Sequence, residues 1–309
     1  MVALETLLPV FFMLALGFVS RVKGWITSEQ KAGANRIVFN ILFPILVFSL
    51  MSTASIEFST IYIVGYVFIM FLLSVVVGKV FSKFIDERFQ HISPYLMSTC
   101  EGGNVALPLY LSIVGQSSNT VIFDIAGTII CFVVFPVLVA RASASSSSPA
   151  ELIKKIFSNS FVLATLFGLV MNVTGIYSMI DVSSFGPTYN AIIAQATTPI
   201  VSIILFLIGF DLKLDKDTLG PIVRFLSVRF GFYALVIVGF FILFPSLMAD
   251  KIYLMAVLIY FMCPAGFGLA PILSPLIKND TDSSFMSAVM SLGMIVTLIV
   301  YTCVVLFIA

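Results

Sequence analysis

The sequence has very little charge. Asp, Glu, Lys and Arg together make up 10% of the 309 residues, whereas a soluble globular domain carries about a quarter. Hydrophobic residues make up 60% of the chain, and the mean hydropathy is +1.15. This composition excludes an ordinary soluble domain and indicates a protein embedded in a membrane.

The residue types that most enzymes and metal sites need are also scarce. His91 is the only histidine, and the four cysteines, Cys100, Cys131, Cys263 and Cys303, lack the spacing of a metal site or a secreted disulfide framework. There is no His-Glu-x-x-His motif, no pair of aspartates within an apolar segment, and no basic cluster of the kind that binds nucleic acid. We therefore expect no enzyme, no metal, no cofactor and no nucleic-acid partner.

Long apolar segments account for most of the chain, and crossing a bilayer takes about 20 residues per helix. Because the backbone must hydrogen-bond within its own segment in lipid, such continuous runs predict helices. The ten predicted segments are 4–22, 34–53, 60–82, 92–115, 120–141, 156–178, 187–210, 221–245, 251–275 and 283–308. The first has no positive n-region and no cleavage site, so we interpret it as a spanning helix. The predicted fold class is an all-α polytopic membrane protein.

The basic residues predict the orientation of these ten helices, numbered one to ten. Of the 16 Lys and Arg residues, all but Lys251 lie in or beside the loops that follow the odd-numbered helices. Cytoplasmic loops carry the excess of Lys and Arg. We therefore expect these loops to face the cytoplasm and both termini to lie outside the cell, with the protein in the plasma membrane.

The two halves of the chain share a pattern. Residues 17–24 and 168–175 both read G-[FL]-V-x-x-V-x-G, at an offset of 151. Two pairs of prolines follow at offsets of 155 and 156: Pro44 with Pro199, and Pro108 with Pro264. Five helices is an odd number, so a second copy would lie upside down in the membrane, an architecture typical of secondary transporters. The alternative is a Gly and Pro rhythm common to many membrane helices.

This repeat divides the chain. It predicts a first five-helix repeat over 1–141 and a second, inverted repeat over 156–309. A Ser-rich cytoplasmic linker over 142–155 joins them, because its composition is that of a flexible segment.

Helices four and nine are expected to be broken near the middle of the membrane. Glycine pairs weaken a helix, and proline removes one of its hydrogen bonds. The interrupting residues are Gly102, Gly103 and Pro108 in helix four and Pro264, Gly266, Gly268 and Pro271 in helix nine. Breaks in matching helices of inverted halves indicate a transport site, where the N–H groups of a half-helix suit a carboxylate. Kinks that serve only helix packing are the alternative.

Polar residues near these breaks are the candidate site. The predicted substrate-binding residues are Asn104, Pro108, Gly103, Pro264, Gly266, Asn40 and Ser49. Glu101 is a carboxylate at mid-membrane depth, so it is the candidate for binding a proton or a coupling ion such as Na⁺. A neutral, hydrogen-bonded packing role is its alternative. We expect Asp124 near the outer surface, and Arg229 to guide anions from the cytoplasm or to snorkel.

Several motifs, in order along essentially the whole chain, carry a family resemblance. They are L-P-V-F-F at 8–12, F-N-I-L-F-P-I-L-V-F at 39–48, G-N-V-A-L-P-L at 103–109, I-G-F-D-L at 208–212 and C-P-A-G at 263–266. The chain resembles the auxin efflux carrier family in its short bacterial form. The resemblance implies ten helices in two inverted halves, with helices four and nine crossing at prolines, and Asn104, Pro108 and Pro264 at the crossing. It also implies elevator-like movement and organic-acid substrates, such as indole-acetate, malate or malonate. The Glu101-Gly102-Gly103 run departs from the expected neutral sequence.

Together these observations predict a secondary transporter, expected to be an exporter, of small organic anions such as dicarboxylic acids. A sodium- or proton-coupled uptake carrier is the alternative, and an anion channel or a membrane-embedded enzyme is less favoured. The sequence leaves open which acid is moved, and whether the protein forms a homodimer.

Overall fold

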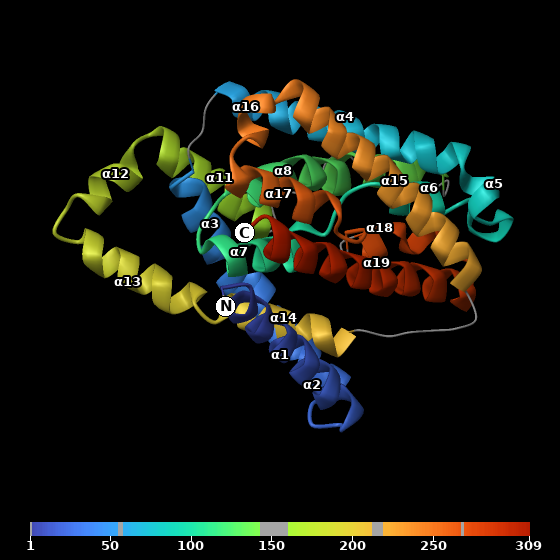
Figure 1. Ribbon diagram of the computed structural model, residues 1–309, viewed down its shortest axis with the longest axis horizontal. Helices are drawn as coiled ribbons and strands as arrows, with labels where there is room; N and C mark the ends of the chain where they lie inside the picture. Colours follow the sequence, from blue (N-terminus) through green and yellow to red (C-terminus); the bar gives the residue numbers. More distant parts are fainter. Residues whose placement is uncertain (1, 55–57, 143–159, 212–218, 267–268) are drawn as a thin grey trace.

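A computed structural model gives the arrangement of the chain (Figure 1). It describes residues 2–54, 58–142, 160–211, 219–266 and 269–309. In these residues every regular element is a helix and there is no strand, which confirms the all-α prediction. The predicted linker over 142–155 lies outside the described residues, apart from Ala142.

The first half of the chain contains helices in each of its five predicted segments. They are α1 (Val2–Val22), α2 (Ser28–Ile37), η1 (Val38–Leu42), α3 (Phe43–Ser52), α4 (Phe58–Val80), α5 (Ser82–Ile85), η2 (Glu87–Phe89), α6 (Ser93–Met97), η3 (Gly102–Ala106), α7 (Leu107–Val114), α8 (Asn119–Ile129), η4 (Ile130–Val134) and α9 (Phe135–Ala142). Helix two starts earlier than predicted because Thr27 and Gln30 form a capping box. It then continues through the π-helical turn η1, which precedes Pro44.

The second half follows the same order of predicted segments. Its helices are α11 (Ser160–Val173), α12 (Ile176–Asp181), α13 (Gly186–Thr197), α14 (Ile200–Asp211), α15 (Leu219–Leu243), α16 (Pro245–Met248), α17 (Lys251–Phe261), α18 (Leu269–Leu273), η5 (Ser274–Leu276) and α19 (Asp280–Phe307). Helix six ends earlier than predicted, because the chain turns at Gly175, which has a φ of 72°. Glycine adopts this left-handed conformation without steric cost.

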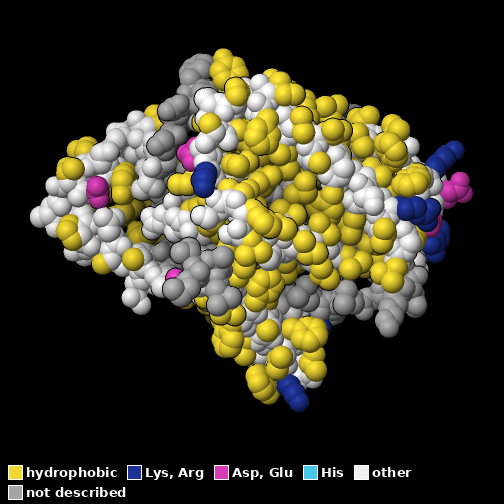
Figure 2. Space-filling view, viewed as in Figure 1, with side chains coloured by type: hydrophobic (Ala, Val, Ile, Leu, Met, Phe, Trp, Pro, Cys, Tyr) yellow, Lys and Arg dark blue, Asp and Glu magenta, His cyan; other side chains and the backbone are white. Residues whose placement is uncertain are grey.

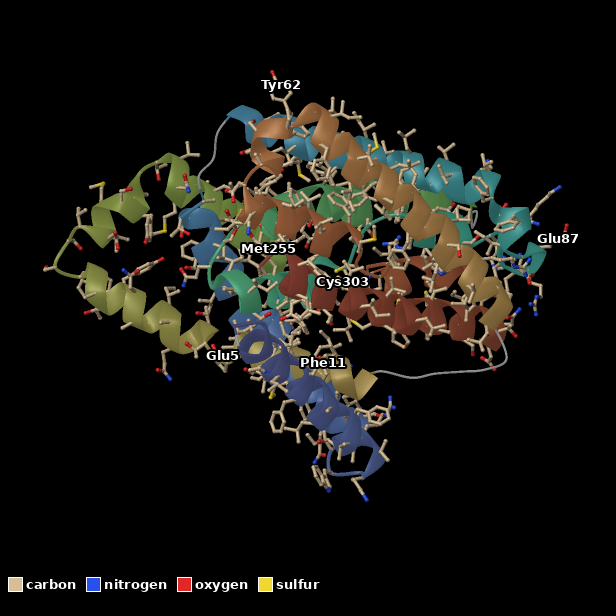
Figure 3. All side chains as sticks on the ribbon, in the orientation of Figure 1. Glu5, Phe11, Tyr62, Glu87, Met255 and Cys303 are labelled. Carbon is tan, nitrogen blue, oxygen red and sulfur yellow. The ribbon has the colours of Figure 1, made fainter. Side chains whose placement is uncertain are left out.

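Within the described residues, five helical stretches are long and apolar enough, by length and composition, to cross a membrane: Ser28–Ser52, Thr60–Val80, Gly186–Phe210, Leu219–Leu243 and Asp280–Phe307. Shorter apolar helices occupy Leu7–Val22, Asn119–Ile129, Val162–Val173 and Lys251–Phe261. Tyr62 on α4 points away from the molecule, whereas Met255 on α17 is buried (Figure 3). Apolar side chains cover the middle of the face in Figure 2, and most of the visible Lys and Arg lie toward its ends. Such a surface suits hydrocarbon rather than water.

The helices form two groups. In the first, called here the paired-helix group, α1 packs along α14 and α3 packs along α11. In the second, the crossing group, α4 packs on α6, α8 and α15, and α17 packs on α7, α8, α15 and α19. Of these, α6, α7 and α17 belong to the two segments that are expected to be broken, and α4, α8, α15 and α19 pack on them (Figure 1).

Glycine permits the close packing within the paired-helix group. A Cβ on Gly17 of α1 would overlap the backbone of Phe206 on α14. A Cβ on Gly168 of α11 would lie 2.6 Å from Cβ of Met51 and 2.7 Å from the carbonyl oxygen of Phe48, both on α3. Without a side chain, each glycine lets two helix backbones approach.

Side chains also satisfy the carbonyl ends of these helices, which have no partner within a helix. Arg21 Nη1 donates to the carbonyl of Phe210, near the end of α14, at 2.9 Å. At the end of α3, Asn172 Nδ2 donates to the carbonyls of Met51 at 3.1 Å, Ser52 at 3.0 Å and Ala54 at 2.7 Å. In each pair, a side chain of one helix therefore caps the end of the other.

Candidate functional site

Helix four is interrupted over residues 98–101. Its first half, α6, ends at Met97, and the chain becomes helical again at η3, which leads into α7. Thr99 lies within the interruption and has a φ of 52°, which is uncommon for a residue other than glycine. Pro108 lies in the first turn of α7, which continues from η3 without a gap, so it is inside the second half of helix four. Pro108 therefore follows the break instead of causing it.

Helix nine is also interrupted. Its first half, α17, ends at Phe261, and α18 begins at Leu269. Pro264 lies between the two halves, whereas Pro271 is the third residue of α18. Pro108 and Pro264, which the sequence pairs, therefore occupy different parts of their segments: Pro264 is within its break and Pro108 follows its break.

The two interruptions contact each other. The backbone N–H of Glu101 donates to the carbonyl of Pro264 at 2.9 Å. A Cβ on Gly266 would lie 3.0 Å from Thr99 Oγ1, so the backbone of the second break packs against a side chain of the first. Backbone groups freed from helical pairing in one segment are thus partly satisfied by the other, as a buried break requires.

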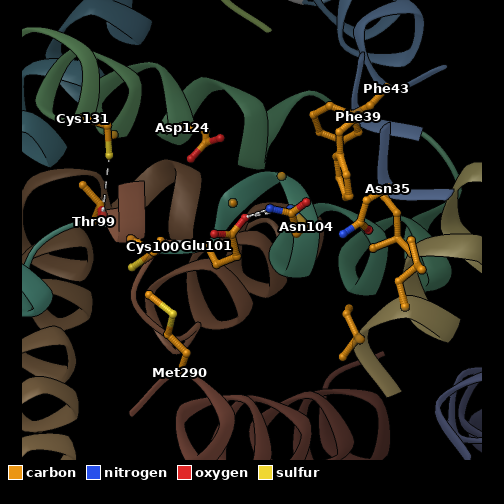
Figure 4. Close-up of a pocket in the computed structure, with 18 of the residues that line it drawn as sticks. Asn35, Phe39, Phe43, Thr99, Cys100, Glu101, Asn104, Asp124, Cys131 and Met290 are labelled. Atoms are coloured by element: carbon orange, nitrogen blue, oxygen red, sulfur yellow. Dashed lines mark hydrogen bonds between the residues drawn. The ribbon is translucent and has the colours of Figure 1, made fainter. Parts of the chain in front are cut away.

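A cavity of about 750 Å³ lies beside this contact (Figure 4). The crossing group contributes Thr99, Glu101, Asn104, Asp124, Gly266 and Met290 to its wall. From the paired-helix group, α14 contributes Ile204 and Leu207, and Lys31, Asn35 and Phe39 come from α2 and η1, which continue into α3 of that group. The cavity therefore lies between the two groups of helices.

Glu101 is at the centre of this wall and is 5% exposed. Its carboxylate accepts a hydrogen bond from the backbone N–H of Asn104 at 3.1 Å and another from the Asn104 side-chain amide. Glu101 therefore caps the start of η3, the positive end of the second half of helix four. The helix end that was expected to suit a substrate carboxylate is therefore already capped by a carboxylate of the chain itself.

Asp124 faces the same cavity from α8 (Figure 4). Its Oδ1 accepts a hydrogen bond from the Tyr260 hydroxyl of α17 at 3.0 Å. A Cβ on Gly102 would overlap the Asp124 carboxylate, which shows how closely this group packs beside Glu101. The expectation that Asp124 lies near the outer surface is wrong, because the break in helix four opens the interior as far as α8.

These features are a cavity, two helix breaks in contact and two carboxylates, in a chain covered by apolar side chains. A family model described as "membrane transport protein" matches residues 2–159, a little over half of the chain. The chain belongs to this membrane transport family. The family is that of the auxin efflux carriers, so the resemblance seen in the sequence is confirmed.

Membership of the membrane transport family settles two further predictions. The chain is a multi-pass membrane protein, and it belongs to a family of transporters rather than of enzymes. A search of curated proteins finds no match.

In this membrane transport protein the predicted site residues fall into two sets. Those that line the cavity are Asn40, Glu101, Gly103, Asn104 and Gly266. The other three, Ser49, Pro108 and Pro264, are not among its lining residues. The Ser49 carbonyl accepts from Ser52 Oγ at 2.9 Å within α3, while Pro108 and Pro264 are buried beside the crossing.

Sequence reasoning missed several residues that the breaks bring to the cavity. Lys31 and Asn35 belong to α2, which was not expected to reach the site. The capping box of Thr27 and Gln30, which starts helix two before residue 34, was the signal that could have placed Lys31 on it. Among the described residues, no group of three His, Cys, Asp or Glu side chains could hold a metal ion.

Arg229 on α15 is placed differently from either expectation for it. Its side chain is 0% exposed and donates to backbone carbonyls of both interruptions. It therefore neither guides anions at the cytoplasmic surface nor snorkels, because the carbonyls that bind it lie inside the protein.

Proposed function

We propose that the protein is a secondary transporter that exports small organic anions by alternating access. The observation that carries the proposal is the cavity between the two helix groups, beside two helix breaks in contact. Interrupted helices that meet within the membrane are where carriers of this kind bind substrate. A volume of about 750 Å³ is ample for a small organic acid.

The lining chemistry favours an acid with an apolar part. Lys31 supplies a positive charge, and Asn35 and Asn40 supply amide donors for a carboxylate. Phe39 and Phe43 offer an apolar wall for the rest of the molecule. These donors are on helix two, so the substrate carboxylate is expected to bind on the side opposite Glu101.

The two carboxylates of the crossing group suggest how transport is coupled to an ion. Glu101 and Asp124 face one cavity, and two ionised carboxylates there would repel each other and an anionic substrate. A proton bound at this pair removes the repulsion. We therefore propose that the pair takes up a proton when the substrate binds. The same carboxylates favour the second candidate, a carrier that couples uptake to Na⁺.

Packing within the paired-helix group supports two inverted repeats, over 1–141 and 156–309. Gly17 and Gly168 are related by the sequence offset of 151. Their contacts, Phe206 and Met51, are related by the offset of 155 that joins Pro44 to Pro199. Helix one thus packs on helix seven as helix six packs on helix two.

The helix caps support the same relation. Arg21 and Asn172 are also 151 residues apart, and each donates to carbonyls at the end of the helix that its own helix packs on. The basic residue belongs to the copy expected at the cytoplasmic side, and the neutral one to the copy expected outside. This supports ten spans with both termini outside the plasma membrane.

The two helix groups suggest how access alternates. The paired-helix group has tight internal packing through glycine, while its contacts with the crossing group are mainly those of α14 with α7 and η3 and of α1 with α7 and α19. We propose that the crossing group carries the cavity past the paired-helix group in an elevator-like movement.

The test is transport by the purified protein in proteoliposomes. We expect saturable uptake of a labelled carboxylic acid and its acceleration by unlabelled acid inside, known as counterflow. Asn104→Ala should reduce the flux at least about tenfold, since it removes the side-chain amide that donates to Glu101 and orients it at the cavity. Asn190→Ala, which loses only an exposed bond to Asp181, should transport normally.

Flux that rises linearly with concentration and shows no counterflow would contradict a carrier and favour a channel. Normal flux in the Asn104→Ala variant would remove Asn104 from the site. Sodium-dependent uptake would favour the second candidate function.

A further inference from the structure

Arg229 is among the largest fully buried side chains of the protein. Its guanidinium nitrogens lie among backbone oxygens. They donate to the carbonyls of Leu96 at 3.0 Å, Met97 at 2.6 Å, Ser98 at 3.5 Å, Thr99 at 2.6 Å and Cys263 at 3.3 Å. The Arg229 cation thus binds four carbonyls at the break in helix four and one at the break in helix nine.

These carbonyls have a common electrostatic character. Leu96 and Met97 are the last residues of α6, and Cys263 follows the end of α17. The last carbonyls of a helix have no helical partner and form the negative end of its dipole. The negative ends of two half-helices therefore converge on the Arg229 side chain.

The surroundings of Arg229 hold it in this position. Its Cζ lies 4.7 Å from the centroid of the Tyr233 ring, one turn further along α15. The Tyr233 hydroxyl donates to the Met97 carbonyl at 3.1 Å. In the part of the chain that the structure describes, no carboxylate forms an ion pair with Arg229. Backbone dipoles and an aromatic face are therefore what balance its charge.

We propose that Arg229 is a built-in cation, which occupies the carbonyl cluster that a coupling Na⁺ would otherwise need. In carriers with interrupted helices, unwound carbonyls and the C-terminal ends of half-helices coordinate the coupling ion. Here those groups point at a guanidinium that is permanently charged and part of the chain. Arg229 is thus a positioning residue that fixes the two breaks relative to each other without a dissociable ion.

Glu101 completes the balance at the same crossing. It caps the positive end of the second half of helix four, while Arg229 neutralises the negative ends of the first halves. Both kinds of helix end are therefore satisfied by charges of the chain itself. Of the coupling ions considered for the proposed carrier, this leaves the proton, so transport is expected not to require Na⁺.

Thermal unfolding of the purified protein tests the inference without any substrate. For the wild type, replacing Na⁺ with choline should leave the midpoint unchanged. Arg229→Ala leaves several carbonyls without a donor and should lower the midpoint by about 5–10 °C. Methylguanidinium should restore at least half of this loss, whereas tetramethylammonium at the same ionic strength should restore none, because it cannot donate hydrogen bonds.

Arg224→Ala is the matched control. Arg224 lies on the same helix and donates to the Phe84 carbonyl at 2.9 Å, but its side chain is 43% exposed. Water can replace that bond, so this variant should unfold near the wild-type midpoint and should not respond to methylguanidinium.

Arg229→Lys decides the matter if the alanine variant fails to fold. One ammonium cannot reach carbonyls of both breaks in the fork geometry of a guanidinium. Stabilisation of the lysine variant by methylguanidinium or by Na⁺ would support the proposal, and an unchanged midpoint under both would overturn it. The proposal is also overturned if the alanine variant folds and methylguanidinium does not raise its midpoint.

Transport gives an independent outcome. Wild-type flux in proteoliposomes that falls when choline replaces Na⁺ would overturn the proposal that Arg229 takes the place of the coupling ion. The inference rests on the proposed carrier for this consequence only. If no organic acid is transported but methylguanidinium rescues Arg229→Ala, the proposed substrate class fails and the role of Arg229 stands.

Discussion

His91 Nε2 lies 2.9 Å from Asp282 Oδ2, and this contact joins the start of helix four to the start of α19. The Phe89 and Phe285 rings stack beside it, with centroids 3.9 Å apart. Asp282 is 2% exposed and also accepts the backbone N–H of Lys278 at 2.9 Å. The loop before helix four, the loop before α19 and α19 itself therefore meet at one carboxylate.

Replacing Asp282 by alanine should destabilise the protein. The change leaves the Lys278 backbone N–H, whose bond is partly buried, and the His91 ring without their acceptor, which costs about 1–3 kcal/mol. Asp280→Ala is the control, because Asp280 is exposed at the first turn of the same helix and contributes only a helix-dipole interaction of about 0.3–1 kcal/mol. Equal unfolding midpoints for the two variants would mean that the His91–Asp282 contact contributes nothing measurable.

The glycine contacts between α1 and α14 and between α11 and α3 give a second prediction. Gly17→Ala and Gly168→Ala each force apart two helix backbones, and overpacking of this kind costs about 1–3 kcal/mol. Gly65→Ala on α4 is the control, because a Cβ there meets nothing within 4 Å. Thermal unfolding in detergent should show a lower midpoint than wild type for the first two variants and an unchanged midpoint for the third. A repeat-related pair is expected to respond alike.

The sequence predicted where helices lie, because the thickness of the hydrocarbon sets the length of an apolar segment. It also predicted interruptions near the middle of helices four and nine, and Pro264 lies within the second of them. In helix four the interruption covers residues 98–101, whereas Gly102 and Gly103, which were expected to cause it, belong to the helical turn η3 that follows. What it did not predict is which residue ends each half-helix. That depends on the contact between the breaks, where Glu101 donates to Pro264.

Arg229 shows why other contacts of the site could not be predicted from the sequence. Four of its five partner carbonyls lie more than a hundred residues earlier in the chain, at a break in another helix, and the fifth, Cys263, lies at the break in helix nine. No residue type in the sequence marks a carbonyl as unpaired. Asp124 was misplaced for a related reason, since its depth was judged along helix five alone while the cavity reaches it through helix four.

Asp86 gives a prediction of pH dependence outside the membrane. Arg88 donates from Nε to Asp86 Oδ1 at 3.0 Å and from Nη2 to Oδ2 at 2.9 Å, and these bonds lower the pKa of Asp86 below its ordinary value. A lowered pKa in the folded state stabilises the protein above the unfolded pKa, and that stabilisation is lost as the pH falls through the folded value. Asp86→Asn should therefore lower the unfolding midpoint at neutral pH, and the difference from wild type should shrink in acid. A difference that stays constant with pH would exclude this ionic contribution.

Glu101→Gln is the last test, and it separates the two roles that Glu101 combines. Glutamine keeps an oxygen that accepts the Asn104 N–H, so the cap of η3 and the fold should survive. The charge is lost, so the proposed proton is no longer exchanged at this residue. Flux measured at several pH values should then lose most of its pH dependence, with an unfolding midpoint close to wild type. Asp124→Asn should act in the same direction, because both carboxylates face the cavity and one proton serves the pair. A pH profile identical to wild type in both variants would leave Glu101 as a helix cap alone, and the coupling proton would have to bind elsewhere.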